Sequence, residues 1–390
     1  MKILMINVVC GIRSTGRICT DLAIALETRG HEVKIAYGRE EVPEQFRKYA
    51  VRIGNDMDVK LHGIKARLVD ACGFGSKRAT ERFIKWVKEY DPDVIHLHNI
   101  HGYYLNIEVL FDYLRTCGKK VIWTLHDCWA FTGHAAYCEA AGCERWITGC
   151  FNCPNIKEYP SSLLDRSKYN WINKKQLMNE IPNLLIITPS DWLAKLVKKS
   201  FLSRYELEVV HNGIDTSVFK PTVSCIREKY QLGDKKVVLG VAAIWDERKG
   251  FNDFLRLRDL LDNSYQIILI GLNKYQISVL PEGILGILRT DSVDQLVQFY
   301  SMADVFFNPT YEDNYPTTNL EAIACGTPVI TYDTGGSGES AKMFGRIVEK
   351  GNIKKVAEEI EKSYFIKDTL ADVSSDSFVE KYLMKYRGLV

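Results

Sequence analysis

The sequence has no long apolar run. No uninterrupted stretch of about 18 or more apolar residues, the length a membrane-spanning helix requires, occurs in the chain. The first residues, MKILMINVVCGIRSTG, contain Asn7 in a short apolar run and lead into a glycine turn instead of the small-residue cleavage site of a signal peptide. We therefore expect a cytoplasmic protein, and thiols in that compartment stay reduced.

The chain also lacks a strong net charge, a short internal repeat and any low-complexity segment. Its formal net charge is +2, so the overall electrostatic field gives no reason to expect nucleic acid as a partner. Hydrophobic residues make up 46% and charged residues 26%, values typical of a globular protein with sizeable cores. A length of 390 residues exceeds one ordinary core and predicts two domains of roughly 150–200 residues each.

Short apolar runs alternate with segments that carry apolar residues at helical spacing. This alternation is typical of βαβ units and predicts α/β domains with doubly wound parallel sheets. The pattern restarts after residues 200–220, which indicates two successive arrays. We expect an N-terminal domain over 1–205 with a cysteine-rich insert at 134–154, a C-terminal domain over 206–372, and a helix over 373–390 that packs back on the first domain.

The segment FFNPTYEDNYPTTNLEAIACGTPVITYDTGG, residues 306–336, carries the sharpest motif. A strand ends at Pro309, a loop holds Glu312 and Asp313, and Thr317 or Thr318 caps the helix that follows. The free N–H groups at such a terminus attract an anion such as phosphate. Glu321, one turn into the helix, can reach the hydroxyls of a ribose. The alternative is an ordinary capped helix with acidic residues nearby.

Cations and a glycine follow the first strand of each array. Arg248 and Lys249 suit a pyrophosphate leaving group whose growing charge needs stabilising, although a solvated basic turn has the same residues. In the N-terminal half, Gly16 lets the backbone approach a substrate at a helix start, and Arg17 is placed for a phosphate. The turn is not a G-x-G-x-x-G fingerprint, so a nicotinamide enzyme is not favoured.

Histidines cluster after two further strands of the first array. His98, Asn99 and His101 follow one strand, and the pair His126-Asp127 follows the next. Ligands bind beyond the carboxyl ends of strands in open α/β sheets, so these side chains point to hydrogen bonding with a substrate. Structural histidines are the alternative.

The motif at 306–336 resembles the signature of the family-4 glycosyltransferases, which are retaining enzymes of the GT-B fold with two Rossmann-like domains facing across a cleft. Seven residues separate Asp313 from Glu321, as in that family's pair of acidic residues. By resemblance, Glu312 or Asp313 holds hydroxyls of the hexose and Glu321 holds the ribose. The amides of Pro316 to Thr318 bind the diphosphate.

Further family matches lie outside this motif. Lys249 and Gly250 match the family's Lys-Gly, whereas Ile244 stands where the family has arginine, and Arg248 supplies the missing charge. The resemblance makes His126, Lys249 and Asp313 the catalytic residues. It assigns Gly16 to the sugar donor, and Arg17, His98, Asn99, His101 and Asp127 to the acceptor.

The stretches DVIHLHNIHGYYLNIEVLF and WTLHDCWAFTGHAAYCEAAGCERWITGCFNCP resemble a bacterial subgroup that assembles O-antigen, capsule or exopolysaccharide. The resemblance implies hexose transfer from UDP- or GDP-hexose to a lipid-linked oligosaccharide, with no metal needed for catalysis and with domain closure excluding water. The acceptor would bring the protein to the inner membrane face. The alternatives are a GT-B nucleotide-sugar epimerase or hydrolase, and a non-catalytic regulator that binds sugar nucleotides.

Four of the 11 cysteines lie in CEAAGCERWITGCFNCP, and they leave three interpretations open. Cys138, Cys143, Cys150 and Cys153 could bind a structural zinc ion, with His134 as another candidate for the fourth ligand. The reducing compartment disfavours two disulfides. Plain thiols remain the third interpretation.

Overall fold

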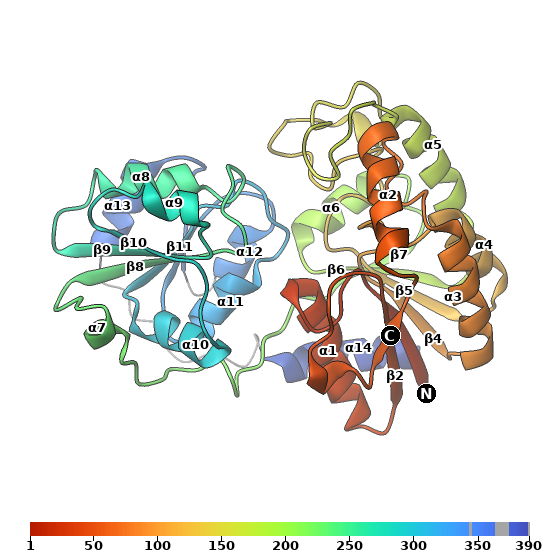
Figure 1. The fold of residues 1–390 in the computed structure, drawn as a ribbon, viewed down its shortest axis with the longest axis horizontal. Helices are drawn as coiled ribbons and strands as arrows, with labels where there is room; N and C mark the ends of the chain where they lie inside the picture. Colours follow the sequence, from red (N-terminus) through yellow and green to blue (C-terminus); the bar gives the residue numbers. More distant parts are fainter. Residues whose placement is uncertain (343–344, 363–373, 389–390) are drawn as a thin grey trace. The chain divides into compact units, whose positions relative to one another are not determined.

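The computed structural model describes residues 1–342, 345–362 and 374–388, and it divides the chain into two compact units. The first unit comprises Met1–His211 and Val379–Val390, and the second comprises Asn212–Phe378. Each unit is built around one parallel sheet with helices packed on it (Figure 1). The predicted α/β class with two doubly wound domains is therefore confirmed.

The first unit holds a seven-stranded sheet in the order β3-β2-β1-β4-β5-β6-β7. All of its strand pairs are parallel. The order reverses direction between β1 and β4, and such a reversal creates a crevice at the carboxyl edge. The strands are β1 (Lys2–Ile6), β2 (Glu32–Tyr37), β3 (Ala50–Arg52), β4 (Val94–Leu97), β5 (Lys120–Thr124), β6 (Leu184–Thr188) and β7 (Glu206–Val209).

The helices of the first unit lie between these strands in the chain, apart from α14, which is the last element. Side chains alternate between the two faces of a strand, so each face needs its own covering layer. The helices of this unit are α1 (Arg13–Glu27), α2 (Asp56–Val69), α3 (Lys77–Tyr90), α4 (Ile107–Thr116), α5 (Ser167–Met178), α6 (Asp191–Lys199) and α14 (Ser375–Arg387), with short 3₁₀ turns at Glu44–Phe46 and Arg145–Ile147.

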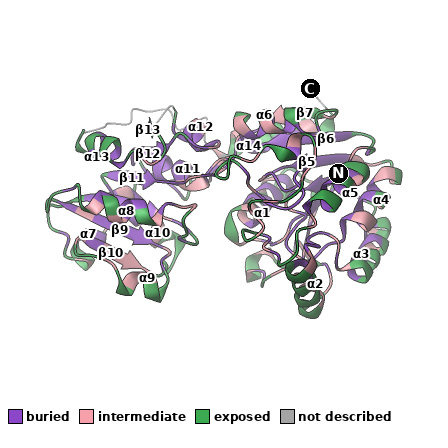
Figure 2. Ribbon diagram, turned by 90° about the horizontal axis from the view of Figure 1, so that it is seen from above, coloured by how far each residue is buried: buried purple, intermediate pink, exposed green. Residues whose placement is uncertain are grey.

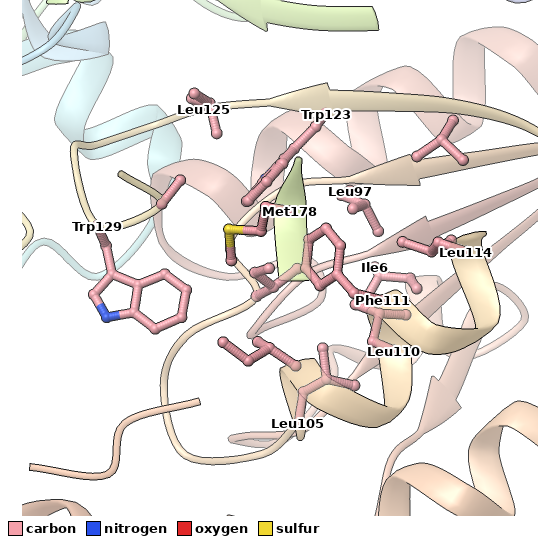
Figure 3. Close-up of a cluster of buried hydrophobic side chains, with 14 of the residues drawn as sticks. Ile6, Leu97, Leu105, Leu110, Phe111, Leu114, Trp123, Leu125, Trp129 and Met178 are labelled. Carbon is pink, nitrogen blue, oxygen red and sulfur yellow. The ribbon is translucent and has the colours of Figure 1, made fainter. Parts of the chain in front are cut away.

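A large apolar core fills one face of the first sheet (Figure 3). Leu97 and Trp123, from neighbouring strands, are fully buried beside Phe111 of α4. The Phe111 and Trp123 rings lie 5.6 Å apart between centroids. Burial of such side chains contributes roughly 1.5–3 kcal/mol each. This core anchors the strands whose carboxyl ends carry the histidines.

The second unit holds a six-stranded parallel sheet in the order β10-β9-β8-β11-β12-β13, which reverses direction between β8 and β11. Separate apolar clusters cover its two faces: Leu239 and Phe306 belong to one, Val238 and Phe307 to the other. The strands are β8 (Lys236–Val241), β9 (Tyr265–Ile270), β10 (Ile284–Ile287), β11 (Val305–Asn308), β12 (Val329–Tyr332) and β13 (Gly345–Val348). The helices are α7 (Ile226–Lys229), α8 (Phe251–Arg258), α9 (Lys274–Ser278), α10 (Val293–Met302), α11 (Thr317–Ala324), α12 (Ser337–Ala341) and α13 (Ile353–Glu361).

The predicted boundary between residues 205 and 206 is wrong. Strand β7 pairs in parallel with β6, with Leu185 opposite Glu206, and so belongs to the first sheet. The division falls after His211 instead. The sequence pattern at 205–215 predicts a strand but not the strand with which it pairs, because pairing is a contact between distant segments.

Helix α14 packs on the first unit. The hydroxyl of Tyr382 lies 2.8 Å from Thr124 Oγ1, and that of Tyr386 lies 2.7 Å from His96 Nδ1. These bonds place α14 on the sheet face opposite the one that holds Leu97 and Trp123. The expected boundary between residues 372 and 373 lies outside the described residues.

Helix α2 is an element that the sequence patterns did not predict. Asn55 and Asp58 form a capping box at its start, with Asp58 N–H donating to Asn55 Oδ1 over 3.0 Å. Most of α2 is exposed (Figure 2). Among the described residues, no helix has both the length and the apolar character needed to cross a bilayer.

Candidate functional site

In the second unit, two predicted segments meet where the strand order reverses. Arg248 and Lys249 follow β8, and Glu312 and Asp313 follow β11. The Lys249 ammonium pairs with the Asp313 carboxylate, and the two side chains are 22% and 16% exposed. Arg248 Nη1 donates to the backbone carbonyl of Glu312 over 2.9 Å. The structure therefore unites residues 64 positions apart at one partly open site.

The carboxylate of Asp313 is held in its charged form. Burial works to raise its pKa, but the charges of Lys249 and Arg248 and the N–H of Asn314 together lower it. Glu312, next to it, is 2% exposed, and its backbone carbonyl also accepts from the Thr310 hydroxyl over 3.3 Å. Of the two candidate acidic residues, Asp313 is thus the one that faces Lys249.

Gly250 brings the Arg248–Lys249 loop close to β11. Its φ of +74° is in the left-handed region, and a Cβ there would lie 2.3 Å from the carbonyl oxygen of Pro309. Only glycine satisfies both constraints without a shift of the backbone. Gly250 therefore fixes the approach of Lys249 to the loop that carries Asp313.

The start of α11 differs from the prediction that a threonine caps it. Pro316 occupies the N-cap position and makes no side-chain cap hydrogen bond, so Thr317 and Thr318 are the first two helical residues. The chain enters the helix at Pro316, one residue earlier than the threonine pattern indicated. The N-cap residue thus accepts no hydrogen bond from the first N–H groups of α11, and N–H groups at a helix start suit an anion.

Glu321 lies one turn into α11 and is 2% exposed. Its Oε2 accepts a hydrogen bond from the Tyr300 hydroxyl of α10 over 2.9 Å. A buried carboxylate needs such partners, and this one holds Glu321 in a fixed position. The Tyr300 contact was not foreseen, because only the fold brings α10 beside α11.

In the first unit, the reversal between β1 and β4 gathers the predicted histidines. His98 Nδ1 lies 3.0 Å from His126 Nε2, and their rings stack with centroids 5.3 Å apart. His96, on β4, packs its ring 4.0 Å from that of His98. Burial lowers the pKa of His126 to about 4 and that of His98 well below its usual value, so both imidazoles are neutral at pH 7.

A second pair joins the loops after β4 and β5. His101 Nε2 lies 2.8 Å from Asp127 Oδ2, and His101 Nδ1 lies 3.0 Å from the Tyr159 hydroxyl. Burial acts to raise the pKa of Asp127, but His101, the N–H of Trp129 and His126 together lower it. Asp127 and Tyr159, one at each ring nitrogen, therefore fix the His101 ring.

A cavity of about 270 Å³ opens beside this pair. Only Asn99 and His101 of its lining were predicted from the sequence; Arg13, Arg39 and Tyr159 are among those missed, and Tyr159 lies 58 positions from His101. Arg13 pairs with Glu40 in this lining, and two arginines beside a histidine suit a polar, anionic group. The lining residues are Val8, Val9, Arg13, Thr15, Arg39, Glu40, Asn99, His101 and Tyr159.

Gly16 lies in the first turn of α1 and is buried. A Cβ on it would meet Val9 Cγ2 at 3.0 Å and the nitrogen of Gly11 at 3.2 Å. Its carbonyl accepts from Gly11 N–H over 3.2 Å. Gly16 therefore lets the turn after β1 pack on α1, and its contact with a sugar donor stays a prediction, as does the role of the half-buried Arg17.

The cysteine-rich insert contains free thiols. Cys138 packs in the apolar core, Cys150 Sγ accepts from Gly133 N–H over 3.2 Å, and burial raises the pKa of Cys150 and Cys153 to about 11. Across the residues that the structure describes, no three or more His, Cys, Asp or Glu side chains are grouped so that they could hold a metal ion. A zinc site at Cys138, Cys143, Cys150 and Cys153 therefore stays a prediction, with plain thiols as the alternative.

Sequence comparisons identify the family of this chain. The family description "Glycosyltransferase Family 4" matches residues 15–218, and "Glycosyl transferases group 1" matches residues 224–374. WcaC of Escherichia coli K12, named as a glycosyl transferase of colanic acid biosynthesis, is 26% identical over 379 residues, which cover 92% of this chain and 88% of WcaC. CapM of Staphylococcus aureus, a capsular polysaccharide biosynthesis glycosyltransferase, is 28% identical over 39% of this chain and 43% of CapM.

Solved structures share the fold at low sequence identity. The sucrose-phosphate synthase of Thermosynechococcus elongatus superimposes with a TM-score of 0.72 at 15% identity, covering 99% of this chain and 98% of the other. Anabaena Alr3699/HepE in complex with UDP-glucose gives a TM-score of 0.63 at 16% identity, covering 99% and 95%. The two α/β units are those of the GT-B fold. The chain is a glycosyltransferase and belongs to glycosyltransferase family 4.

Proposed function

We propose that the protein transfers a hexose from a UDP- or GDP-linked sugar to a lipid-linked oligosaccharide, with retention at the anomeric carbon, during assembly of a bacterial surface polysaccharide. The observation that carries the proposal is the meeting of Lys249 and Asp313 beside the start of α11, where the N-cap residue Pro316 makes no side-chain hydrogen bond. The names of WcaC and CapM support a role in the assembly of a surface polysaccharide. The UDP-glucose complex of a structural neighbour supports a nucleotide sugar as the donor.

Each group of the second unit has a role toward the sugar donor. The first N–H groups of α11, from Thr317 onward, and the cations Arg248 and Lys249 hold the diphosphate. Asp313 accepts hydrogen bonds from hexose hydroxyls, and Glu321 accepts them from the ribose. In this arrangement Lys249 bridges the diphosphate and Asp313, so one lysine links the leaving group to the sugar.

The chemistry that fits these residues is attack from the same face as the leaving group. The bond from the anomeric carbon to the diphosphate oxygen breaks while the bond to the acceptor oxygen forms. The acceptor proton passes to the departing diphosphate oxygen, so no protein base is required. Lys249, Arg248 and the amides of α11 stabilise the charge that develops on the diphosphate. These groups supply the stabilisation without a catalytic metal.

The first unit supplies the acceptor side. The neutral imidazole of His126 donates or accepts a hydrogen bond at the transferred sugar, and His98 orients it across their 3.0 Å contact. Asn99 and His101 line the cavity that takes the acceptor, Asp127 supports His101, and Arg17 is a further residue assigned to the acceptor. A lipid-linked acceptor places the protein in the cytoplasm at the inner face of the membrane.

Product analysis tests the proposal. The chain is incubated with UDP- and GDP-hexoses and with an acceptor extracted from the native polysaccharide pathway, and products are identified by mass spectrometry and NMR. We expect one hexose added in the anomeric configuration of the donor. A changed free nucleotide sugar would indicate an epimerase, and binding without turnover would indicate a regulator; either result overturns the proposal.

The variant Glu321→Gln tests the donor site without a change of side-chain shape. We expect a raised KM for the nucleotide sugar and a thermal stability close to that of the wild type. An unchanged KM would contradict the role of Glu321.

Metal analysis of the purified protein tests the zinc prediction for the cysteine insert, and a zinc stoichiometry near zero would leave plain thiols.

A further inference from the structure

Helix α2 exposes an apolar stripe to solvent. Met57, Leu61, Ile64 and Leu68 are 61, 59, 56 and 49% exposed. With 3.6 residues per turn, their spacing of four, three and four places them within an arc of about 60° on one side of the helix. The buried His62 and Ala66 lie on the opposite side and hold α2 to the unit.

Two leucines from a distant segment extend the stripe. Leu163 N–H donates to the Arg67 carbonyl over 2.8 Å, and the Arg67 side chain also bonds Ser161. Leu163 and Leu164 are 67 and 57% exposed. We call the six residues Met57, Leu61, Ile64, Leu68, Leu163 and Leu164 the α2 patch. Monomeric proteins rarely expose contiguous apolar surface of this kind without a partner.

Basic residues without carboxylate partners flank the stripe. Lys60 and Arg67 fall on one side of it and Lys65 on the other. Within the described ranges, none of these three takes part in an ion pair, and Lys65 Nζ donates to a backbone carbonyl, that of Phe74, over 2.9 Å. The two acidic residues of α2 are already paired, Asp56 with Arg52 and Asp58 with Arg82.

A basic groove of about 420 Å³ borders the stripe between α2 and the start of α3. Lys65, Lys77 and Arg78 line it together with Leu61 of the stripe. Two carboxylates, Asp58 and Glu108, also lie in the lining, so the cations outnumber them by one. A wall with three cations next to an exposed leucine suits a phosphate group with an attached hydrocarbon chain. Lysine is depleted in protein–protein interfaces, whereas basic flanks are typical of helices that lie on anionic lipid.

An aromatic chain connects α2 to the cavity of the first unit. The rings of His62 and Tyr103 meet edge to face at 5.9 Å, and those of Tyr103 and Tyr159 at 6.1 Å. The Tyr159 hydroxyl bonds His101, and the Arg39 guanidinium lies 5.7 Å from the Tyr103 ring. The rings therefore connect the buried side of α2 to Tyr159 at the cavity, and Leu163 of the α2 patch follows Tyr159 by four residues.

We propose that the α2 patch docks this protein on a bilayer surface that contains anionic lipid. Its six apolar side chains enter the interface, Lys60, Lys65 and Arg67 contact the headgroups, and the adjacent cavity receives the polar head of an acceptor that stays anchored in the bilayer. The role for the acceptor rests on the proposed function, whereas docking on the bilayer does not.

Vesicle sedimentation of the full chain tests docking. The wild type should sediment with vesicles of phosphatidylglycerol and phosphatidylcholine and weakly with phosphatidylcholine alone. The double variant L61S/I64S should lose binding by at least about tenfold, and Lys60→Glu should lose part of it. The matched control Val223→Ser alters a side chain that is 95% exposed in the second unit and should bind as the wild type does.

Two outcomes overturn the proposal. Equal sedimentation of L61S/I64S and wild type would mean that another surface binds lipid. A dimer in solution that L61S/I64S dissociates, without binding to vesicles, would make the patch a contact between copies. Transfer to a water-soluble short-chain acceptor is measured in parallel. If that transfer is absent while vesicle binding is present, the proposed function fails and the docking surface stands.

Discussion

At the scale of single residues, we expect the largest loss of activity from a substitution of Lys249. The variant Lys249→Ala should lower kcat by about 10²–10³-fold, because it removes a cation aimed at the charge that develops on the leaving group. Hexose transfer and hydrolysis of the sugar donor both measure this loss. Lys274→Ala, at an exposed position of α9, is the control with the same charge change and should keep full activity. Retained activity in Lys249→Ala would remove the lysine from the mechanism.

Gly250 allows a prediction with an internal control. Gly250→Ala adds a Cβ 2.3 Å from the Pro309 carbonyl, whereas Gly233→Ala, also at positive φ, meets nothing within 4 Å. Both variants incur backbone strain of about 1–2 kcal/mol, and only Gly250→Ala also moves the loop of Lys249. Urea unfolding should therefore show the larger loss for Gly250→Ala, together with a raised KM for the nucleotide sugar. Equal losses in the two variants would show that the contact with Pro309 is unimportant.

At the scale of elements, α14 fixes a histidine behind the candidate site. Tyr386→Phe removes the hydroxyl that bonds His96 Nδ1, and His96 packs on His98. A buried hydrogen bond of this kind contributes about 1 kcal/mol, so the free energy of unfolding should fall by about that amount. Lys381→Ala, at an exposed position of the same helix, should leave it unchanged. A stable Tyr386→Phe variant would mean that His96 finds another partner.

Helix α2 shows why element prediction failed in one place. Its apolar residues repeat at helical spacing, a pattern that normally marks the buried face. In the structure this face is turned outward, and the buried contacts are made by His62 and Ala66. The local pattern contains the helix, but which side contacts the core depends on the loop that directly follows it, at Ala71, and on Tyr103, which is distant in sequence.

At the scale of the whole molecule, the histidines are divided unevenly. All eight precede Asn212, so the second unit has none. Burial lowers the pKa of His96 to about 3 and of His62 and His126 to about 4. The unfolded chain, with histidine pKa values near 6.5, takes up protons that the folded chain refuses between about pH 6.5 and 4. The first unit should therefore lose stability as the pH falls through this window.

Fluorine NMR of the chain labelled with 5-fluorotryptophan tests whether the first unit loses more stability in acid than the second. Six of the seven tryptophans lie in the first unit and Trp245 lies in the second, and the variant W245F assigns its signal. Between pH 7.5 and 5.0, the urea midpoint of the first-unit signals should fall and that of Trp245 should change less. Equal shifts in both units would show that the buried histidines do not control acid stability.

The sequence by itself determined the alternation of strands and helices, the two arrays, and the positions of Lys249, Asp313 and the histidines after strands. These features follow from local periodicity and from the rule that ligands bind at carboxyl ends of strands. Only the tertiary structure decided that β7 joins the first sheet, that α14 covers His96, that Tyr159 reaches His101, and that the α2 stripe faces outward. Each of these is a contact between segments far apart in the chain, and no local pattern specifies which distant surface an element will meet.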